Sequence, residues 1–185
     1  MSVEANVPTE AEFFVDVAEI VAEFLPRRIE FAELPFPPQV VARKLIDWAG
    51  EARAIIEGAI AYARDANLQM AVVVVDHAGN LVSADRMDGA SLQNIRFAEG
   101  KAFAAALYRQ TTEELGALYK TRPDRYFGIM NMYPGKIYLV GGGVPLAIDG
   151  QLVGGVGVAG LPEGVDEKSA RAGMAAWMKL RETKK

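Results

Sequence analysis

Apolar residues recur every three or four positions through the first third of the chain, which is the spacing of one face of an amphipathic helix. This pattern predicts a helix over residues 10–25, ended by Pro26, and a second helix from about Pro38 to Ala66. The second helix would be about 40 Å long, which is more than a small sheet can cover. We therefore expect part of it, together with the first helix, to serve a subunit contact.

The middle third of the chain alternates between strand and helix patterns. A continuous apolar run predicts a central strand over residues 70–76, and a turn returns the chain as a second strand over residues 81–86. Alanines in helical register predict a helix over residues 91–108. The order Thr-Thr-Glu-Glu from Thr111 predicts a capping box that starts a short helix. Residues 120–136 are predicted to form an irregular loop.

Glycines dominate the last third. Asp149 and Gly150 tolerate the positive φ angles of a two-residue turn, so the apolar runs beside them predict a β-hairpin, preceded by another strand at residues 137–140. The second hairpin strand, residues 151–160, lacks many of the side chains expected for packing. Its glycines are Gly154, Gly155, Gly157 and Gly160. Such bare positions usually mark close backbone approach, so we expect a helix, a neighbouring subunit or a ligand against this strand. Asp166 is predicted to cap the terminal helix.

These elements together predict an α+β fold. Its centre would be a five-stranded antiparallel sheet with helices packed mainly on one face. No low-complexity linker divides the chain, so we expect one domain over residues 38–185. Residues 1–37 would form an N-terminal extension with one amphipathic helix.

Composition narrows the possible functions. The net charge of -4 argues against a nucleic-acid surface, and no apolar run approaches the length that crosses a membrane. The N-terminus lacks the basic start of a signal peptide, so a cytoplasmic protein is expected. With no cysteine and a single histidine, His77, we expect no disulfide and no metal site within one chain.

The order Gly-x-Gly-x-x-Gly over residues 155–160 matches a dinucleotide-binding fingerprint, but its context does not fit. That fingerprint joins a strand directly to a helix and is followed about 20 positions later by an acidic residue. Here the loop 161–165 intervenes, and residues 175–180 contain no acid. We therefore do not expect nucleotide binding.

Several short motifs together resemble the GlcG/HbpS family of haem-binding or haem-degrading-like proteins. They are the strand 72–76, the turn 86–90, Lys101-Ala102, Gly-Gly-Gly-Val-Pro at 141–145, Asp149-Gly150 and the glycine-rich strand. This resemblance implies a profilin-like α+β fold, a homo-oligomer, and ligand sites near subunit contacts. Members are variously described as haem-binding, redox-sensing or of unknown role.

The segment 122–138 is rich in aromatic, thioether and basic residues. Such a composition suits a flat apolar ring that bears a carboxylate. With its Arg-Pro-Asp-Arg-Tyr-Phe-Gly start, the chain is also similar to 4-hydroxylaminobenzoate lyases. That resemblance implies a cofactor-independent enzyme that converts 4-hydroxylaminobenzoate to 3,4-dihydroxybenzoate and ammonia, with haem binding or non-catalytic sensing as the alternatives.

Such a lyase needs a proton donor, a base and an anchor for the carboxylate. The candidate catalytic residues are Tyr126 or Tyr133 as donor and Glu99 or His77 as base. The candidate substrate-binding residues are Arg122, Arg125, Lys136, Arg86, Phe127, Met130, Gly142 and Gly143. We expect the substrate to lie where the 120–138 segment meets the glycine-rich strands.

Each candidate also has a purely structural interpretation. His77 would then be a solvated turn residue, Glu99 a solvent-facing helical residue, and the tyrosines anchors of a loop under the core. Arg86 and Asp88 would form a local ion pair or a helix cap. Because the axial donors usual for haem are scarce, any haem affinity is expected to be weak or to use an oxygen ligand.

Overall fold

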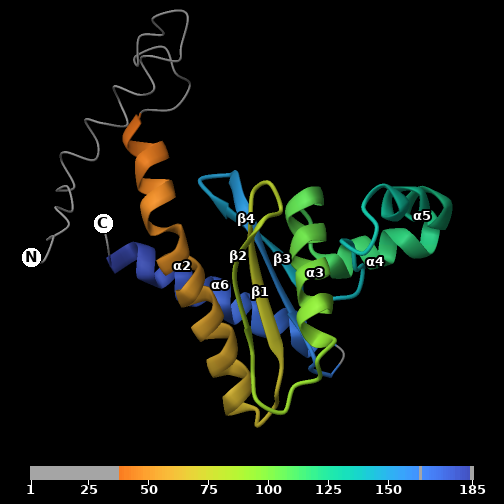
Figure 1. Cartoon of the computed structure of the whole chain (residues 1–185), viewed down its shortest axis with the longest axis horizontal. Coiled ribbons are helices and arrows are strands. Elements are labelled where there is room, and N and C mark those ends of the chain that lie inside the picture. The colour runs from red at the N-terminus through yellow and green to blue at the C-terminus, as the bar shows by residue number, and fades with distance from the viewer. Residues whose placement is uncertain (1–37, 163, 184–185) are drawn as a thin grey trace, which may run out of the picture. The chain divides into compact units, whose positions relative to one another are not determined.

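The structure, a computed structural model, describes residues 38–162 and 164–183, with side chains from Trp48 onward. Two compact units divide the chain, Met1–Ile46 and Asp47–Lys185, and the second carries the sheet. The predicted helix at residues 10–25 lies outside the described residues. The elements are α2 (Pro38–Asp65), β1 (Ala71–Asp76), β2 (Leu81–Arg86), α3 (Asn94–Tyr108), α4 (Thr112–Thr121), α5 (Pro123–Met132), β3 (Gly143–Ile148), β4 (Gln151–Ala159) and α6 (Val165–Thr183) (Figure 1).

The sheet is antiparallel throughout, in the order β2-β1-β4-β3. The predicted α+β class and the predicted hairpins are therefore confirmed. Asp149 and Gly150 have φ angles of 51° and 76°, which a two-residue turn between β3 and β4 requires. β1 and β4 occupy the centre, and β2 and β3 form the two edges.

The described residues contain four strands rather than the predicted five. Residues 137–140 do not join the sheet, because Ile137 and Leu139 pack instead against a small cluster around Leu115 and Tyr126. The Tyr138 N–H donates a hydrogen bond to the Gly100 carbonyl at 3.2 Å, which fixes this segment along α3. A short apolar run is compatible with either environment, so periodicity alone did not distinguish them.

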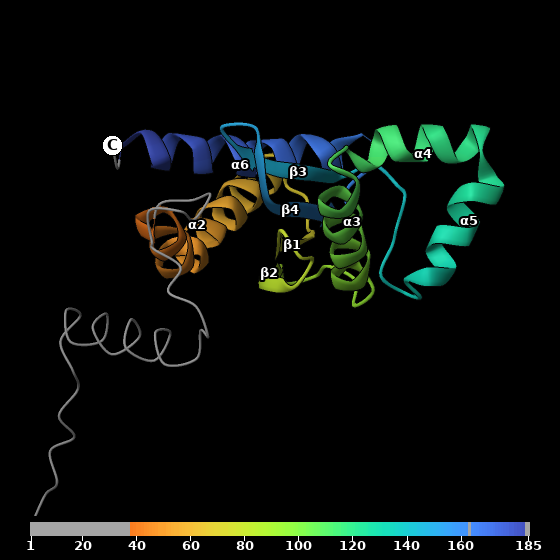
Figure 2. The ribbon, with the colours of Figure 1, turned by 90° about the horizontal axis from the view of Figure 1, so that it is seen from above.

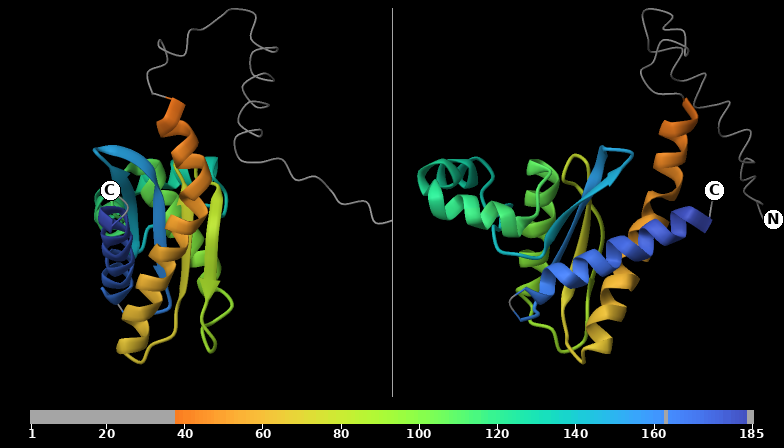
Figure 3. Two further views of the ribbon diagram at one scale, coloured as in Figure 1. Left: turned by 90° about the vertical axis from the view of Figure 1, so that its left-hand side faces the viewer. Right: turned by 180° about the vertical axis from the view of Figure 1, so that it is seen from behind.

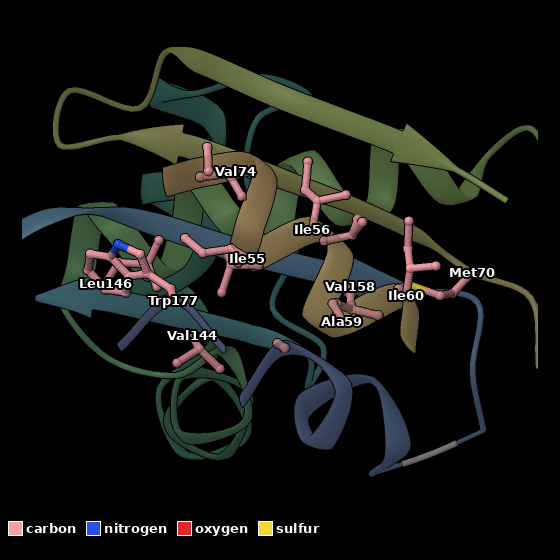
Figure 4. Packing of buried hydrophobic residues seen from close by; sticks show 14 of the residues in the cluster. Ile55, Ile56, Ala59, Ile60, Met70, Val74, Val144, Leu146, Val158 and Trp177 are labelled. Atoms are coloured by element: carbon pink, nitrogen blue, oxygen red, sulfur yellow. The ribbon is translucent and has the colours of Figure 1, made fainter. Parts of the chain in front are cut away.

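Helices cover both faces of the sheet, which corrects the prediction of helices mainly on one face (Figure 2). The reason lies in β1, where five consecutive residues are buried, so that both of its faces need cover. Val72 and Val74 pack with α2 and α6 in the main core, in which Figure 4 shows Val74 with Ile55 and Trp177. Ala71, Val73 and Val75 pack against α3 on the opposite face.

The glycines of β4 admit α3, so the expected close neighbour of this strand is a helix. A Cβ atom at Gly155 or Gly157 would collide with the carbonyl oxygen of Ala102 or Ala98. With alanines on the facing side of α3, the two backbones approach closely.

Residues 123–132 form the helix α5, not the predicted irregular loop. Pro123 occupies its first turn, where a proline costs no hydrogen bond. The predicted capping box is confirmed, with Thr111 and Glu114 bonded reciprocally at the start of α4. The two helices extend away from the sheet (Figures 1 and 3).

Candidate functional site

The Phe103 ring, on the outer side of α3, lies where three segments meet. A Cβ atom at Gly79, in the turn between β1 and β2, would lie 2.5 Å from this ring. The Tyr133 ring is 5.5 Å from it between centroids, and the Lys136 ammonium is 5.7 Å from its centroid. We call Phe103, Tyr133, Lys136 and Gly79 the Phe103 cluster; His77 lies two residues before Gly79 in the same turn.

The turn that carries His77 is fixed by the carboxylate of Asp76. This carboxylate accepts hydrogen bonds from the Ala78 N–H at 2.8 Å, the Asn80 N–H at 2.9 Å and the Asn80 side chain at 3.1 Å. Partial burial raises the pKa of Asp76, but these hydrogen bonds outweigh it and hold the pKa below its ordinary value. The turn is therefore ordered, and His77 is exposed on it. A solvent-exposed turn residue is one of the interpretations that the sequence left open.

The segment after α5 is fixed across the outer side of α3. The Tyr138 ring stacks on Phe97 with centroids 4.7 Å apart and planes 15° apart. A turn closes where the Lys136 N–H donates to the Tyr133 carbonyl at 3.0 Å. These contacts place both Tyr133 and Lys136 beside Phe103.

Glu99 lies one helical turn before Phe103 on α3, a spacing that puts the two side chains on one side of the helix. It is half-buried and accepts a hydrogen bond from Arg96 at 3.1 Å. The structure thus brings Glu99 near the cluster with its carboxylate already paired.

The remaining candidates of the 122–138 segment lie elsewhere on α5 or at its start. Tyr126 is 6% exposed, and its ring lies 6.1 Å from Tyr108 and 6.5 Å from Tyr119. It therefore anchors α5 to α3 and α4. Arg122, Arg125 and Phe127 are exposed, and Met130 is half-buried.

Tyr108 has a buried hydroxyl with no hydrogen-bond partner among the described residues. Burial raises the pKa of this phenol, and the nearby Tyr126 raises it further. The group packs beside α5, and Tyr133 of the Phe103 cluster is close enough to contribute to the same rise in pKa.

Gly142 and Gly143 surround a buried ion pair rather than the Phe103 cluster. A Cβ at Gly142 would lie 2.7 Å from that of Asp166, and one at Gly143 would lie 2.5 Å from the Lys101 carbonyl oxygen. Lys101 donates to Asp166 at 2.6 Å and to the Val158 carbonyl at 2.9 Å. Asp166 also accepts from the Leu161 N–H at 2.9 Å, so it lies within α6 as a partner of Lys101 and not at the predicted cap.

Burial lowers the pKa of Lys101 and raises the pKa of Asp166, while the hydrogen bond and the attraction between them oppose both changes.

The inner side of α3 contacts the glycine-rich strand, and its outer side contacts the 133–138 segment. The two surfaces approach each other where the Lys101 ammonium, beside Gly142, lies 5.9 Å from the centroid of the Tyr138 ring.

Arg86 is at the far end of the β1–β2 hairpin from His77, because it pairs with Ala71 at the start of β1. Five residues of strand separate the two ends, about 17 Å. The Arg86 guanidinium donates to the Ala90 carbonyl, and it forms no ion pair with Asp88 among the described residues. Arg86 therefore belongs to a different surface.

Sequence reasoning did not identify Phe103 and gave Lys101 no function. The available signal for Phe103 was a single bulky aromatic residue within an alanine-rich stretch, residues 102–106. Its importance depends on residues 79 and 133, which lie far along the chain in either direction.

The described residues contain neither a membrane-spanning helix nor a metal-ligating cluster. None of the helices is long and apolar enough to cross a membrane. Within the same part of the chain, no three or more His, Cys, Asp or Glu residues are grouped so that they would hold a metal ion.

Comparison with protein families finds one matching model, described as haem degrading protein HbpS-like, over residues 49–175. A Citrobacter freundii protein of uncharacterized function is 31% identical over 59% of this chain and 76% of its own length. The corrinoid adenosyltransferase PduO of Salmonella typhimurium is 31% identical over 86% of this chain but only 46% of its own length.

Solved structures agree with these matches. A double mutant of Streptomyces reticuli HbpS has a TM-score of 0.61 and 34% identity, over 69% of this chain and 84% of that chain. A complex of PduOC with heme has a TM-score of 0.63 and 28% identity, over 69% of this chain and 91% of that chain. These relatives confirm the resemblance to the GlcG/HbpS family. They contradict the prediction that no cofactor is involved, because the matching family is described as haem degrading and one similar structure is a haem complex.

Proposed function

We propose that this chain, which belongs to the HbpS-like family of haem-degrading proteins, binds haem at the Phe103 cluster. The observation that carries the proposal is the meeting of the Phe103 and Tyr133 rings, the Lys136 ammonium and the turn of His77 on one side of α3. The haem complex of the related PduOC supports the choice of ligand.

The chemistry of the donors in the cluster fits haem. The half-buried rings of Phe103 and Tyr133 offer apolar contact area to a flat macrocycle. The exposed ammonium of Lys136 offers a charged hydrogen bond to a propionate. For the iron, the adjoining turn offers the imidazole of His77, and the cluster offers the hydroxyl of Tyr133, as an axial donor.

When bound, haem would supply a redox-active iron. The chain's own residues would bind and orient it. The hydrogen bonds to Asp76 keep the backbone around His77 in one conformation, so an imidazole donor would need little ordering on binding. The Tyr138 contacts with α3 do the same for Tyr133 and Lys136.

The same cluster also carries a second proposal, a lyase acting on 4-hydroxylaminobenzoate. One candidate from each required group lies at or near Phe103: Tyr133 as donor, His77 or Glu99 as base, and Lys136 as anchor. No relative named above supports this activity, so haem binding is our main proposal.

Titration of the full chain with haem tests the main proposal. We expect a saturable change of the Soret band, and no change at stoichiometric protein would contradict haem binding. Incubation with 4-hydroxylaminobenzoate, with ammonia and 3,4-dihydroxybenzoate measured as products, tests the second proposal separately.

Self-association is part of the same proposal. The two edge strands, β2 and β3, end the sheet within the described unit, and edge strands are common sites of pairing between chains. Light scattering that gave the mass of a single chain at micromolar concentration would contradict a homo-oligomer.

A further inference from the structure

A groove of about 580 Å³ lies at the opposite end of the β1–β2 hairpin from His77. Its walls are the last turn of α2, the loop that follows, and the end of β2 with the turn after it. Ligand sites in proteins commonly have volumes of about 300–1,000 Å³. The groove is therefore large enough for a molecule with one or two rings.

Two guanidinium groups line this groove, those of Arg64 and Arg86. Neither has a carboxylate within ion-pair distance in the described part of the chain. The Arg86 guanidinium donates one hydrogen bond to the Ala90 carbonyl, which fixes its position. Its other N–H donors are left to bind a ligand.

The acids that line the groove do not cancel this charge. Asp85 is already paired with Arg53, whose guanidinium lies 2.7 Å from its carboxylate. Asp88 is then the one acid in the lining without an ion pair among the described residues, against the two arginines. The groove therefore keeps an excess of positive charge.

The rest of the lining is ordered and mixed in polarity, with Asn67 and Gln69 as its uncharged polar members. Ile60 and Met87 reach the groove from the main core, and Leu68 and Ala84 lie beside them. Hydrogen bonds from the Leu68 N–H to the Ala63 carbonyl, at 2.9 Å, and from the Met87 N–H to the Met70 carbonyl, at 3.0 Å, fix the loop and the turn. These apolar side chains next to unpaired cations match a ligand with an apolar body and an anionic end, to which Asn67 and Gln69 offer further polar contacts.

We propose that this groove binds an amphipathic carboxylate of one or two rings. Its carboxylate would pair with Arg64 and Arg86, and its rings would lie against Ile60, Leu68 and Met87. The site is separate from the Phe103 cluster, since Arg86 and His77 are at opposite ends of one hairpin.

Calorimetric titration of the full chain with 2-naphthoate tests this proposal. We expect saturable binding, and weaker binding of the uncharged 2-naphthamide. Arg64→Ala and Arg86→Ala are each expected to weaken the affinity for 2-naphthoate about tenfold or more, because each removes a charged hydrogen-bond partner. Arg86→Lys should restore only part of the affinity, because lysine lacks the bidentate fork.

Lys179→Ala is the matched control, because it removes one exposed positive charge from α6, outside the groove lining. Since Arg86 also holds the Ala90 carbonyl, thermal unfolding of every variant is measured, and Arg64→Ala carries the test if Arg86→Ala does not fold. The Soret titration of Arg64→Ala should match the wild type, which separates this site from the haem site.

Three results would each overturn the proposal: no binding of 2-naphthoate to the wild type, equal affinity for the acid and the amide, or unchanged affinity in folded Arg64→Ala. Displacement of 2-naphthoate by stoichiometric haem would also contradict it, since the two sites would then not be separate.

Discussion

The ammonium of Lys101 lies 2.6 Å from the Asp166 carboxylate, although 65 residues separate them in the chain. Lys101 is 2% exposed, and it also donates to the Val158 carbonyl at the end of β4. The pair therefore joins α3, on one face of the sheet, to the first turn of α6, on the other. Because α3 also carries Phe103, the pair fixes the helix on which the proposed haem site is built.

Lys101→Met is expected to lower the free energy of unfolding by about 3–5 kcal/mol, since it leaves the Asp166 carboxylate buried without its cation. The double variant Lys101→Met with Asp166→Leu should recover much of this loss, because no unpaired charge remains. Urea unfolding of both proteins gives the comparison.

The control for this prediction is Arg171→Met, which removes the more exposed ion pair with Glu167. Its expected cost is at most about 1 kcal/mol. Equal losses of unfolding free energy in the two single variants would contradict a larger contribution from the buried Lys101–Asp166 pair.

Gly157→Ala should destabilise the protein strongly, because the added Cβ would lie 2.6 Å from the Ala102 backbone nitrogen and closer still to the Ala98 carbonyl oxygen. Overpacking of this kind costs about 1–3 kcal/mol or more. Gly128→Ala is the matched control: the added atom meets nothing within 4 Å and lies inside α5. There we expect a gain of about 0.5–1 kcal/mol, and the melting temperatures of the two variants should move in opposite directions.

The glycines of the β3–β4 hairpin show which features of the fold the sequence predicts. The Asp149-Gly150 turn and the bare positions of β4 are local signals, and both led to correct expectations. Residues 137–140 form no strand because Ile137 and Leu139 find burial on α3 and α4, which no local pattern records. Tertiary packing decides the outcome for such short apolar runs.

In the candidate site, too, the sequence predicts chemically suitable residues but not which of them lie together. Residue type alone selected His77, Tyr133 and Lys136, yet nothing in their spacing related them to Phe103. Chemistry likewise selected Tyr126, although the structure places its ring among Tyr108 and Tyr119. Which chemically suitable residues share one surface depends on how α3 and α5 pack.

The turn that presents His77 should lose stability in acid. Hydrogen bonds hold the pKa of Asp76 below its ordinary value, so this carboxylate stabilises the folded state above the unfolded pKa, about 4, and the contribution is lost as the pH falls through the folded value. Asp76→Asn should therefore be less stable than the wild type near pH 7, by about 1 kcal/mol.

Below the folded-state pKa of Asp76 the two proteins should unfold at nearly the same urea concentration. The exposed Asp65 provides a control substitution, Asp65→Asn, at the end of α2. A difference between wild type and Asp76→Asn that stayed constant down to about pH 2 would contradict this role of the carboxylate.

Lys136→Ala should weaken haem binding about tenfold by removing the partner of a propionate, and Lys136→Arg should largely retain it. Lys120→Ala, an exposed lysine of α4, is the control. Haem affinities from Soret titrations at one ionic strength make the comparison, and equal losses in the two alanine variants would point to a general effect of charge.

The most direct test of the proposed function compares haem affinity in Phe103→Ala and Phe127→Ala by Soret titration. Phe103 lies at the centre of the cluster, whereas Phe127 is 61% exposed on α5. Both variants are first shown by circular dichroism to be folded. We predict a loss of affinity of about tenfold or more for Phe103→Ala and wild-type affinity for Phe127→Ala. Wild-type haem binding by a folded Phe103→Ala protein would contradict a haem site at the Phe103 cluster.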